Sequence, residues 1–364
     1  MVRELGIGGC ERDVAKIALA LDRSRFEPHV GCFYAQGLRY AELRAAGIPI
    51  VEFPLRSFRS PSLFVAMNRF RAYVRRHKIQ LVHTYDVPTT DFAIPTARLC
   101  RMRGVVSSQL GYRDLFTRTE RAILRATDRM ADRIVVNCEA MRRHMIDDEK
   151  VSPDLVYLCY NGVNTSEFFP MKQLRPPVLQ DASLVIGIIC ALRPEKRIDL
   201  LLSAFARVWQ LQPGLKMLIV GSGPLLETLQ AHAASLKIEG ACVFEPATRD
   251  VSSWMRAIDI FVLPSDSEAF SNALLESMAS GCCPIGSRVG GTPELIEHQR
   301  TGLLFERGNV EDLAAQLTLV IGDTPMREAM ASAAAVFARD RFSMERAAST
   351  TGALYSSLLE QPCR

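Results

Sequence analysis

The sequence has no long hydrophobic run and no cysteines spaced to hold a metal. None of its apolar stretches approaches the roughly 18–20 residues that a transmembrane helix requires. The ten cysteines include no C-x-x-C pair and no histidine partner at ligand spacing, which argues against a zinc site. We expect them to be reduced thiols, mostly small core residues, in a cytoplasmic protein.

A nucleic-acid partner is not expected either. The chain has no helix-turn-helix pattern, and its basic residues are not interleaved with aromatic ones. The charge is nevertheless uneven, because residues 1–175 carry 28 Lys and Arg against 19 Asp and Glu, a balance of +9. Residues 176–364 carry 16 against 21, a balance of −5, which gives the net charge of +4. A basic first half suits an anionic partner such as lipid headgroups or a lipid-linked diphosphate.

What the chain does have is a regular alternation of short β-branched runs and helical patterns in both halves. This alternation predicts an α/β protein with two doubly wound parallel sheets. Ligands of such sheets bind beyond the carboxyl ends of the strands, here in a cleft between two domains. The proline-rich residues 169–177 are the best linker candidate, so we place the first domain at residues 1–168 and the second at 169–342.

One segment, residues 265–297, carries the strongest functional signal. An apolar run leads into a loop with Glu268, and the helix that follows contains Glu276 about one turn inside. Either Ser271 or Asn272 can cap this helix, and Gly281 is a suitable stop. Backbone N–H groups at the positive end of the helix dipole would face the same space; they belong to Ser271, Asn272 and Ala273. A phosphate held between two carboxylates suggests a nucleotide-sugar site.

The segment resembles the E-x7-E signature of the retaining glycosyltransferases of family 4, which have the GT-B fold. Further segments match the family in its own order along nearly the whole chain: residues 6–12, 81–86, 131–145, 160–170, 191–205, 218–224 and 290–296. The resemblance implies two Rossmann-like domains facing a cleft, with a last helix in residues 343–364 that crosses back to the first domain. It also implies transfer of a sugar from a nucleoside-diphosphate sugar to an acceptor hydroxyl, with retention at the anomeric carbon.

The resemblance assigns roles to the two glutamates. Glu276 would accept hydrogen bonds from the ribose hydroxyls, and Glu268 would meet the transferred sugar. The other interpretation of Glu276 is a solvated helix residue. The residues after Glu268 also fit the family's phosphate loop, which adds Phe270 to the donor site.

Lys196 follows the first strand of the second domain. A fixed cation there stabilises the charge that develops on the β-phosphate when a nucleoside diphosphate departs. The family has an arginine five positions before this lysine, where this sequence has Ala191. Either Arg193 substitutes for it, or the site relies on Lys196 and the helix dipole. No Asp-x-Asp pair is positioned to hold a metal-bound diphosphate, so we expect no metal and no cofactor besides the nucleotide-sugar substrate.

Two loops of the second domain are donor-site candidates. Gly221 and Gly223 follow an apolar run, but position 226 is leucine instead of the third glycine of a dinucleotide fingerprint, which argues against a dehydrogenase. In the family this loop lies near the donor, where the two glycines would keep the path open. Arg249, with Asp250, matches the loop that flanks the base.

The first domain offers weaker candidates. Gly8 and Gly9 precede a helix and would let the backbone approach a diphosphate or an acceptor, unless they form an ordinary loop. His83 ends a strand expected to face the cleft, although a lone histidine is usually structural. The family's sugar-contacting histidine is missing, since its place is taken by Gln109, Leu110 or Gly111. Tyr112 and Arg113 are the residues nearby that could contribute instead.

Residues 62–78 predict a basic amphipathic helix. It is either a membrane-surface element or a core-packed helix with a solvated cationic face, and we favour the second. The whole sequence is read as a cytoplasmic glycosyltransferase, peripheral at the inner face of the membrane, with a lipid-linked or saccharide acceptor in polysaccharide or glycolipid synthesis. A sugar-nucleotide epimerase of the same architecture, or a catalytically weak binding protein, is the alternative.

Only residues 2–5 precede the first glycine loop, which is short for a central strand of about five or six residues. We expect that a misplaced start site or a shortened chain removed most of this strand. The missing strand would leave backbone groups unpaired, so the first half is expected to be weakly stable or prone to aggregation.

Overall fold

The computed structural model describes residues 1–6, 8–113, 116–171 and 175–360 and divides the chain into two compact units. Unit 1 contains residues 1–162 and 344–364, and unit 2 contains residues 163–343. The boundary lies ahead of the predicted division at 168/169, because Val163 N–H already donates to Phe342 O (2.8 Å) and Phe168 is buried. Part of the predicted linker, residues 172–174, lies outside the described residues.

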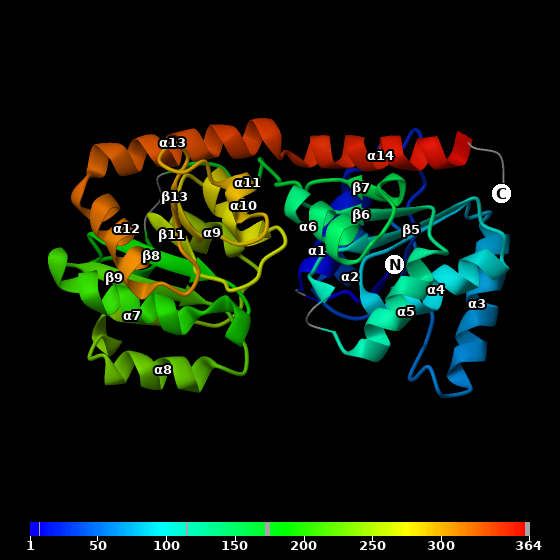
Figure 1. The fold of residues 1–364 in the computed structure, drawn as a ribbon, viewed down its shortest axis with the longest axis horizontal. Coiled ribbons are helices and arrows are strands. Elements are labelled where there is room, and N and C mark those ends of the chain that lie inside the picture. The colour runs from blue at the N-terminus through cyan, green and yellow to red at the C-terminus, as the bar shows by residue number, and fades with distance from the viewer. Residues whose placement is uncertain (7, 114–115, 172–174, 361–364) are drawn as a thin grey trace. The chain divides into compact units, whose positions relative to one another are not determined.

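The strands of unit 1 are all parallel and form two sheets (Figure 1). The first sheet has the order β1-β2-β3, with β1 at Val2–Glu4, β2 at Val30–Tyr34 and β3 at Ile50–Glu52. The second has the order β4-β5-β6-β7, at Leu81–Thr84, Gly104–Gln109, Arg133–Val136 and Val156–Leu158. Met1 links the two sheets, since its carbonyl accepts from Tyr85 N–H (3.0 Å) and its ammonium donates to the His83 carbonyl.

Helices connect these strands in the βαβ pattern expected of parallel sheets. Their bounds are α1 Gly9–Ala20, α2 Leu38–Ala45, α3 Ser62–Arg76, α4 Val87–Leu99, α5 Arg118–Asp128 and α6 Glu139–Arg143. The chain returns to unit 1 with α14, Met344–Glu360, which packs on α1. Its residues Leu354, Tyr355 and Leu358 are buried in a core cluster shared with β5 and β6.

Unit 2 contains one six-stranded parallel sheet with the order β10-β9-β8-β11-β12-β13. In chain order the strands are β8 Leu184–Ile189, β9 Leu215–Val220, β10 Cys242–Glu245, β11 Ile260–Leu263, β12 Cys283–Ser287 and β13 Leu303–Phe305. The central strands β8 and β11 are almost entirely buried, because helices cover both faces of a doubly wound sheet. This is the strand order of Rossmann-like domains. The first and fourth strands lie side by side in the middle, and the connections from them run to opposite edges of the sheet.

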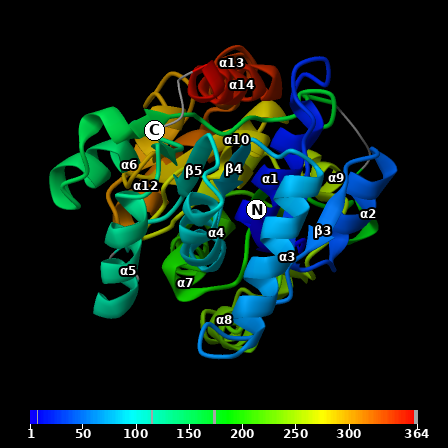
Figure 2. The ribbon, with the colours of Figure 1, turned by 90° about the vertical axis from the view of Figure 1, so that its right-hand side faces the viewer.

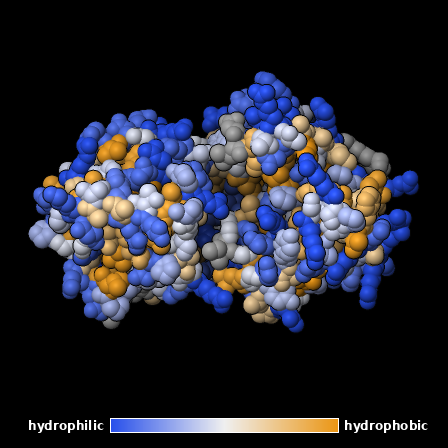
Figure 3. All heavy atoms as spheres, turned by 90° about the horizontal axis from the view of Figure 1, so that it is seen from below, coloured by the Kyte–Doolittle hydropathy of each residue, from blue (hydrophilic) through white to orange (hydrophobic). Residues whose placement is uncertain are grey.

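The helices of unit 2 are α7 Ile198–Val208, α8 Leu226–Ser235, α9 Val251–Arg256, α10 Asn272–Ala279, α11 Thr292–Leu295, α12 Val310–Gly322 and α13 Thr324–Arg341. Among the described residues, no helix has both the length and the apolar content that crossing a membrane demands. Seen from below, each unit carries hydrophobic residues in patches among hydrophilic ones (Figure 3). The prediction of parallel α/β sheets in both halves is confirmed.

Candidate functional site

The strongest site candidate lies in unit 2, where the strand order reverses. Strands β8 and β11 are neighbours, but the connection from β8 leads to β9 on one side and that from β11 to β12 on the other. Ligands of doubly wound sheets bind beyond the carboxyl ends of the strands at such a point. The two loops that meet there, residues 190–197 and 264–271, are joined by a hydrogen bond from Asp266 N–H to Glu195 O (2.9 Å).

Lys196 and Glu268 come together between these loops. Lys196 Nζ donates to Glu268 Oε2 at 2.6 Å, and the two side chains are 20% and 13% exposed. Burial alone would lower the pKa of Lys196, but the charge and hydrogen bond of Glu268 outweigh it and raise this pKa above its usual value. Lys196 is therefore fully charged at neutral pH, next to a carboxylate that can also accept from sugar hydroxyls.

The helix that follows Glu268 is α10, which begins where the sequence predicted. Of the two candidate caps, Ser271 fills the position, and its Oγ accepts from Leu274 N–H at 3.3 Å. Asn272 and Ala273 form the first turn of α10, at the positive end of the helix dipole. The Phe270 ring is buried against Phe342, with centroids 5.4 Å apart, so only the backbone of Phe270 can line a ligand site.

Glu276 lies on α10 and is 1% exposed. The interpretation as a solvated helix residue is therefore wrong. Burial of a carboxylate is unfavourable unless polar groups surround it, so Glu276 needs polar partners inside the protein or from a ligand. Its assignment to the ribose stays a prediction.

Arg197 and Asp266 form a second link between the loops that the sequence did not predict. Arg197 Nη1 donates to Asp266 Oδ2 at 3.0 Å, and Arg307 Nε lies 3.4 Å from Asp266 Oδ1. The backbone of Arg197 is in the left-handed region, with φ 48° and ψ 44°, where a residue other than glycine is strained. The sequence gives no signal for this, because the conformation arises from the turn at Pro194–Lys196 meeting the start of α7.

The loop before Lys196 shows where Arg193 lies relative to Ala191, the position at which the family has an arginine. Ala191 and Arg193 are both exposed, and Arg193 has extended backbone immediately before Pro194. Arg193 is thus on the surface of the loop that carries Lys196. Its role as a substitute for the family arginine stays a prediction.

Gly221 and Gly223 have a packing role. A Cβ atom on Gly221 would lie 1.9 Å from Cys190 O, and one on Gly223 would lie 2.4 Å from Leu192 O. These glycines let the loop after β9 pack directly on the backbone of the Lys196 loop. This close approach of two loops requires glycine at both positions, and the expectation that they keep a path open for the donor stays a prediction.

Arg249 and Asp250, in the loop before α9, are in different surroundings. Asp250 caps α9, since its carboxylate accepts from Ser253 N–H at 3.1 Å. A hydrogen bond of the Ser253 side chain, together with this one from its backbone, lowers the pKa of Asp250. Arg249 is exposed beside it, and its role in the loop that flanks the base stays a prediction.

In unit 1 the glycine loop is at the surface. Gly8 is the N-cap of α1 and Gly9 is its first residue, and both are exposed. A Cβ atom on Gly9 would have no atom within 4 Å, whereas one on Gly8 would contact only the flexible carboxylate of Glu11. The fold itself does not demand glycine at position 9.

His83 lines a pocket of unit 1 together with Tyr85 and Ser108, and its expected place at the cleft stays a prediction. The residue is 8% exposed, its Nδ1 is 2.7 Å from Tyr355 Oη, and its Nε2 is 2.8 Å from Ser108 Oγ. Burial lowers the pKa of His83 well below its usual value, so the ring is neutral. These two hydrogen bonds join His83, on β4, to α14 and to β5.

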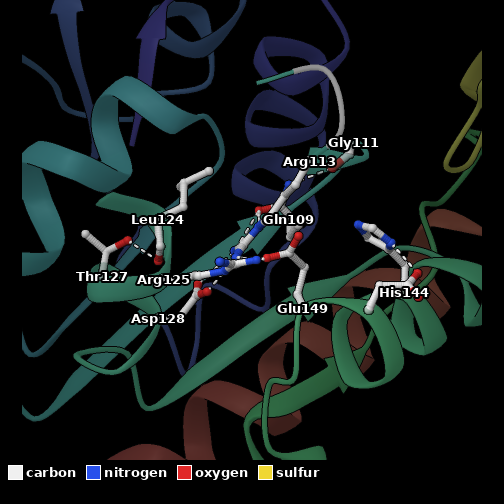
Figure 4. Close-up of polar contacts among 10 residues, drawn as sticks. Gln109, Gly111, Arg113, Leu124, Arg125, Thr127, Asp128, His144 and Glu149 are labelled. Carbon is white, nitrogen blue, oxygen red and sulfur yellow. Dashed lines mark hydrogen bonds and ion pairs between the residues drawn. The ribbon is translucent and has the colours of Figure 1, made fainter. Parts of the chain in front are cut away.

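Arg113 is structural and not a substrate contact. It is fully buried, with Nη1 and Nη2 at 2.8 and 3.0 Å from the two oxygens of Asp128, and it lies 3.5 Å from Glu149 (Figure 4). Gln109 Oε1 accepts from the same guanidinium at 3.1 and 3.2 Å, and Gln109 Nε2 donates to Gly111 O at 2.6 Å. Gln109, one of the three residues that could stand at the place of the family's histidine, therefore holds the loop after β5.

Tyr112 lies in this loop and is half-buried, with its ring packed edge-on against His144 at 5.0 Å between centroids. It remains the one partly accessible aromatic candidate named from sequence in unit 1.

Comparison with known proteins agrees with this architecture. Residues 172–337 match the family described as glycosyl transferases group 1, and residues 7–167 match the family described as Glycosyltransferase Family 4. The N-acetyl-alpha-D-glucosaminyl L-malate synthase of Bacillus anthracis is 30% identical over 215 residues, or 58% of this chain and 56% of the relative. The D-inositol 3-phosphate glycosyltransferase of Streptomyces bingchenggensis is 30% identical over 245 residues, or 63% and 53%. The chain spans about half the length of these curated relatives.

Solved structures share the fold over nearly the full chain. The Anabaena protein Alr3699/HepE, in complex with UDP and glucose, has a TM-score of 0.85 at 21% identity and covers 98% of this chain and 99% of its own. Sucrose-phosphate synthase from Thermosynechococcus elongatus has a TM-score of 0.79 at 19% identity, with 98% and 95% covered. These similarities establish a GT-B fold with two Rossmann-like domains.

Proposed function

The chain belongs to the glycosyl transferases of group 1, and its first half matches Glycosyltransferase Family 4. From this premise we propose that it moves a sugar from a nucleoside-diphosphate sugar to an acceptor hydroxyl, with retention at the anomeric carbon. The observation that carries the proposal is the contact of Lys196 Nζ with Glu268 Oε2 at 2.6 Å, beside the N-terminus of α10. A cation, a carboxylate and a helix N-terminus are what a sugar and a diphosphate require within one small volume.

In the reaction that we propose, the bond between the anomeric carbon and the β-phosphate oxygen breaks, and its electron pair goes to the diphosphate. Lys196 and the N–H groups at the start of α10 stabilise that developing charge more strongly in the transition state than in the bound substrate. The acceptor oxygen forms the new bond, and its proton leaves with the phosphate. Glu268 holds hydroxyls of the transferred sugar, and Glu276 binds the ribose.

Metal independence is part of the proposal. The support is that the positive charges near the diphosphate come from Lys196 and the helix, with Arg193 on the same loop as a further cation. Activity should therefore survive an excess of EDTA. Loss of turnover that magnesium or manganese restores would contradict this part alone.

The acceptor side and the location are proposed together. The acceptor is a saccharide or a lipid-linked molecule in polysaccharide or glycolipid synthesis, and the enzyme acts in the cytoplasm at the inner face of the membrane. Free thiols at the cysteines of the described residues agree with a reducing compartment. The excess of basic residues in the first half agrees with anionic lipid or diphosphate.

A donor panel tests the function. Nucleotide sugars with different bases and sugars are first ranked by the rise in melting temperature, and the best is incubated with saccharide and lipid-linked acceptors. A transferase releases free nucleoside diphosphate in proportion to glycosylated acceptor. An epimerase would interconvert the donor sugar without acceptor, and a binding protein would raise the melting temperature without any turnover. No comparison supports either alternative.

A further inference from the structure

The outer face of α3 carries large apolar side chains that the core does not use. Phe64 and Val65 are 69% and 59% exposed, and Phe58 in the preceding turn is 43% exposed. The opposite face of the helix packs inward through Ala66, Phe70 and Val74, which are buried. The buried face already packs α3 on the core, so the exposed apolar residues are not needed for that packing. Figure 2 shows α3 on the outer side of unit 1, toward the viewer.

The end of α4 extends this face. Helices α3 and α4 pack on each other, and Leu99, at the last position of α4, is 74% exposed. The next residue, Cys100, lies close enough to Arg71 and Arg75 of α3 that their charges act on its thiol pKa, which burial raises. Leu99 is thus an exposed apolar residue at the end of a helix that packs on α3, next to a residue that the α3 arginines approach.

The same segment is strongly and uniformly basic. Residues 53–85 contain seven Lys and Arg and no Asp or Glu. All seven are exposed: Arg56, Arg59, Arg69, Arg71, Arg75, Arg76 and Lys78. Phe64, Asn68, Arg71 and Arg75 follow one another at helical spacing, so apolar and cationic side chains share one stripe. This mixture differs from an ordinary solvated face, which carries both signs of charge and few large apolar groups.

We propose that this α3 surface, formed by Phe58, Phe64, Val65 and Leu99 with the seven basic residues, docks on an anionic lipid bilayer. A helix lying in the interface buries its apolar residues among the acyl chains while arginines remain at the headgroups. Each basic residue near an anionic surface strengthens partitioning by about fivefold. Nucleic acid fits less well, because Val65 and Leu99 are aliphatic and offer no stacking platform for bases. The inference deepens the proposed peripheral location, yet lipid binding can be measured without any turnover.

The experiment is co-sedimentation of the full chain with vesicles of phosphatidylcholine alone or with phosphatidylserine added. We expect binding to the anionic vesicles that falls steeply with salt. Phe64→Ser with Val65→Ser should weaken it at least tenfold at every salt concentration. Arg71→Gln with Arg75→Gln should weaken it at low salt and reduce the salt dependence. Leu319→Ser is the matched control, since Leu319 is 43% exposed on α12 in unit 2, and it should bind as the wild type does.

Several outcomes would overturn the proposal. One is equal binding to neutral and anionic vesicles, and another is anionic binding that the Phe64/Val65 variant leaves intact. Light scattering that shows a dimer abolished by Phe64→Ser would assign the surface to a second copy of the chain. Saturable binding of single-stranded RNA that the apolar variant retains would assign the charge to nucleic acid. Transfer to a water-soluble acceptor should be unchanged in all of these variants, which separates failure of docking from failure of the proposed reaction.

Discussion

Lys196 Nζ and Glu268 Oε2 lie 2.6 Å apart although 72 residues separate them in the chain. The contact exists because β8 and β11 are adjacent strands whose following loops meet at one edge of the sheet. Each side chain restricts the other before substrate arrives. A cation that is already placed and charged needs little reorganisation when the diphosphate departs, which is the condition under which electrostatic stabilisation is largest.

Replacing Lys196 with alanine should lower kcat by on the order of 10²-fold or more, because the charge that stabilises the leaving diphosphate is gone. Steady-state kinetics with saturating donor measures this. Lys216→Ala is the matched control, since Lys216 lies at the amino end of β9, the opposite edge of the sheet from the site. A Lys196 variant as active as wild type would remove the leaving-group assignment.

Substitution of Glu276 should mainly weaken nucleotide binding, whereas substitution of Glu268 should mainly reduce sugar transfer. Glu276→Ala should weaken nucleoside-diphosphate binding by about 1.5–3 kcal/mol, the usual loss when hydrogen bonds to a charged acceptor disappear. Glu268→Ala should leave that binding nearly unchanged and reduce transfer. Calorimetric titration with the free nucleoside diphosphate distinguishes them, and unchanged affinity in the Glu276 variant would exclude its ribose role.

Arg197→Gly should lower kcat without lowering the melting temperature. Glycine relieves about 1 kcal/mol of left-handed strain, so the melting temperature should stay equal or rise. Loss of the link to Asp266 should free the loop that carries Glu268, and kcat should fall with little change in nucleoside-diphosphate affinity. Arg197→Lys should restore part of kcat, whereas Asp266→Asn should reproduce the defect. Full activity in Arg197→Gly would show that the Arg197–Asp266 contact does not position Glu268.

His83 should make unit 1 sensitive to acid. Its folded-state pKa is depressed by burial and by the nearby Met1 ammonium, so below about pH 6.5 the unfolded chain binds a proton that the folded chain resists. Stability is then present above that pH and lost as pH falls, by up to about 1.4 kcal/mol per pH unit. Urea unfolding between pH 7.5 and 5.5 should show a larger loss for wild type than for His83→Gln. Equal losses would mean that other groups carry the acid response.

Local features of the site could be predicted from sequence. The cap at Ser271, the start of α10 and the placement of Glu276 one turn inside follow from neighbouring residues alone. The contact between Lys196 and Glu268 could not be derived in this way, because it depends on which strands become neighbours in the sheet. For the same reason the close approach of Gly221 to Cys190 appeared in the sequence only as a glycine-rich loop.

Distant parts of the chain decide the surroundings of two candidates in unit 1. His83 was expected at a cleft because it ends a strand; α14, more than 250 residues later, adds the hydrogen bond to Tyr355, and the place of His83 at the cleft stays a prediction. Arg113 was expected to be available, but Asp128 and Glu149 come from separate elements and enclose its charge. Strand-end position predicts exposure only when no distant helix or acidic partner returns to that place.

Unit 1 is discontinuous, and this affects the order in which the chain can fold during synthesis. All residues of unit 2 leave the ribosome before α14 does. At roughly 5–20 residues per second, the 162 residues that begin unit 1 wait roughly ten to forty seconds for the helix that covers His83 and buries Tyr355. The second unit to be translated is therefore the first that can be completed, and the hydrophobic surface that α14 covers is where a nascent-chain chaperone has the longest opportunity to bind.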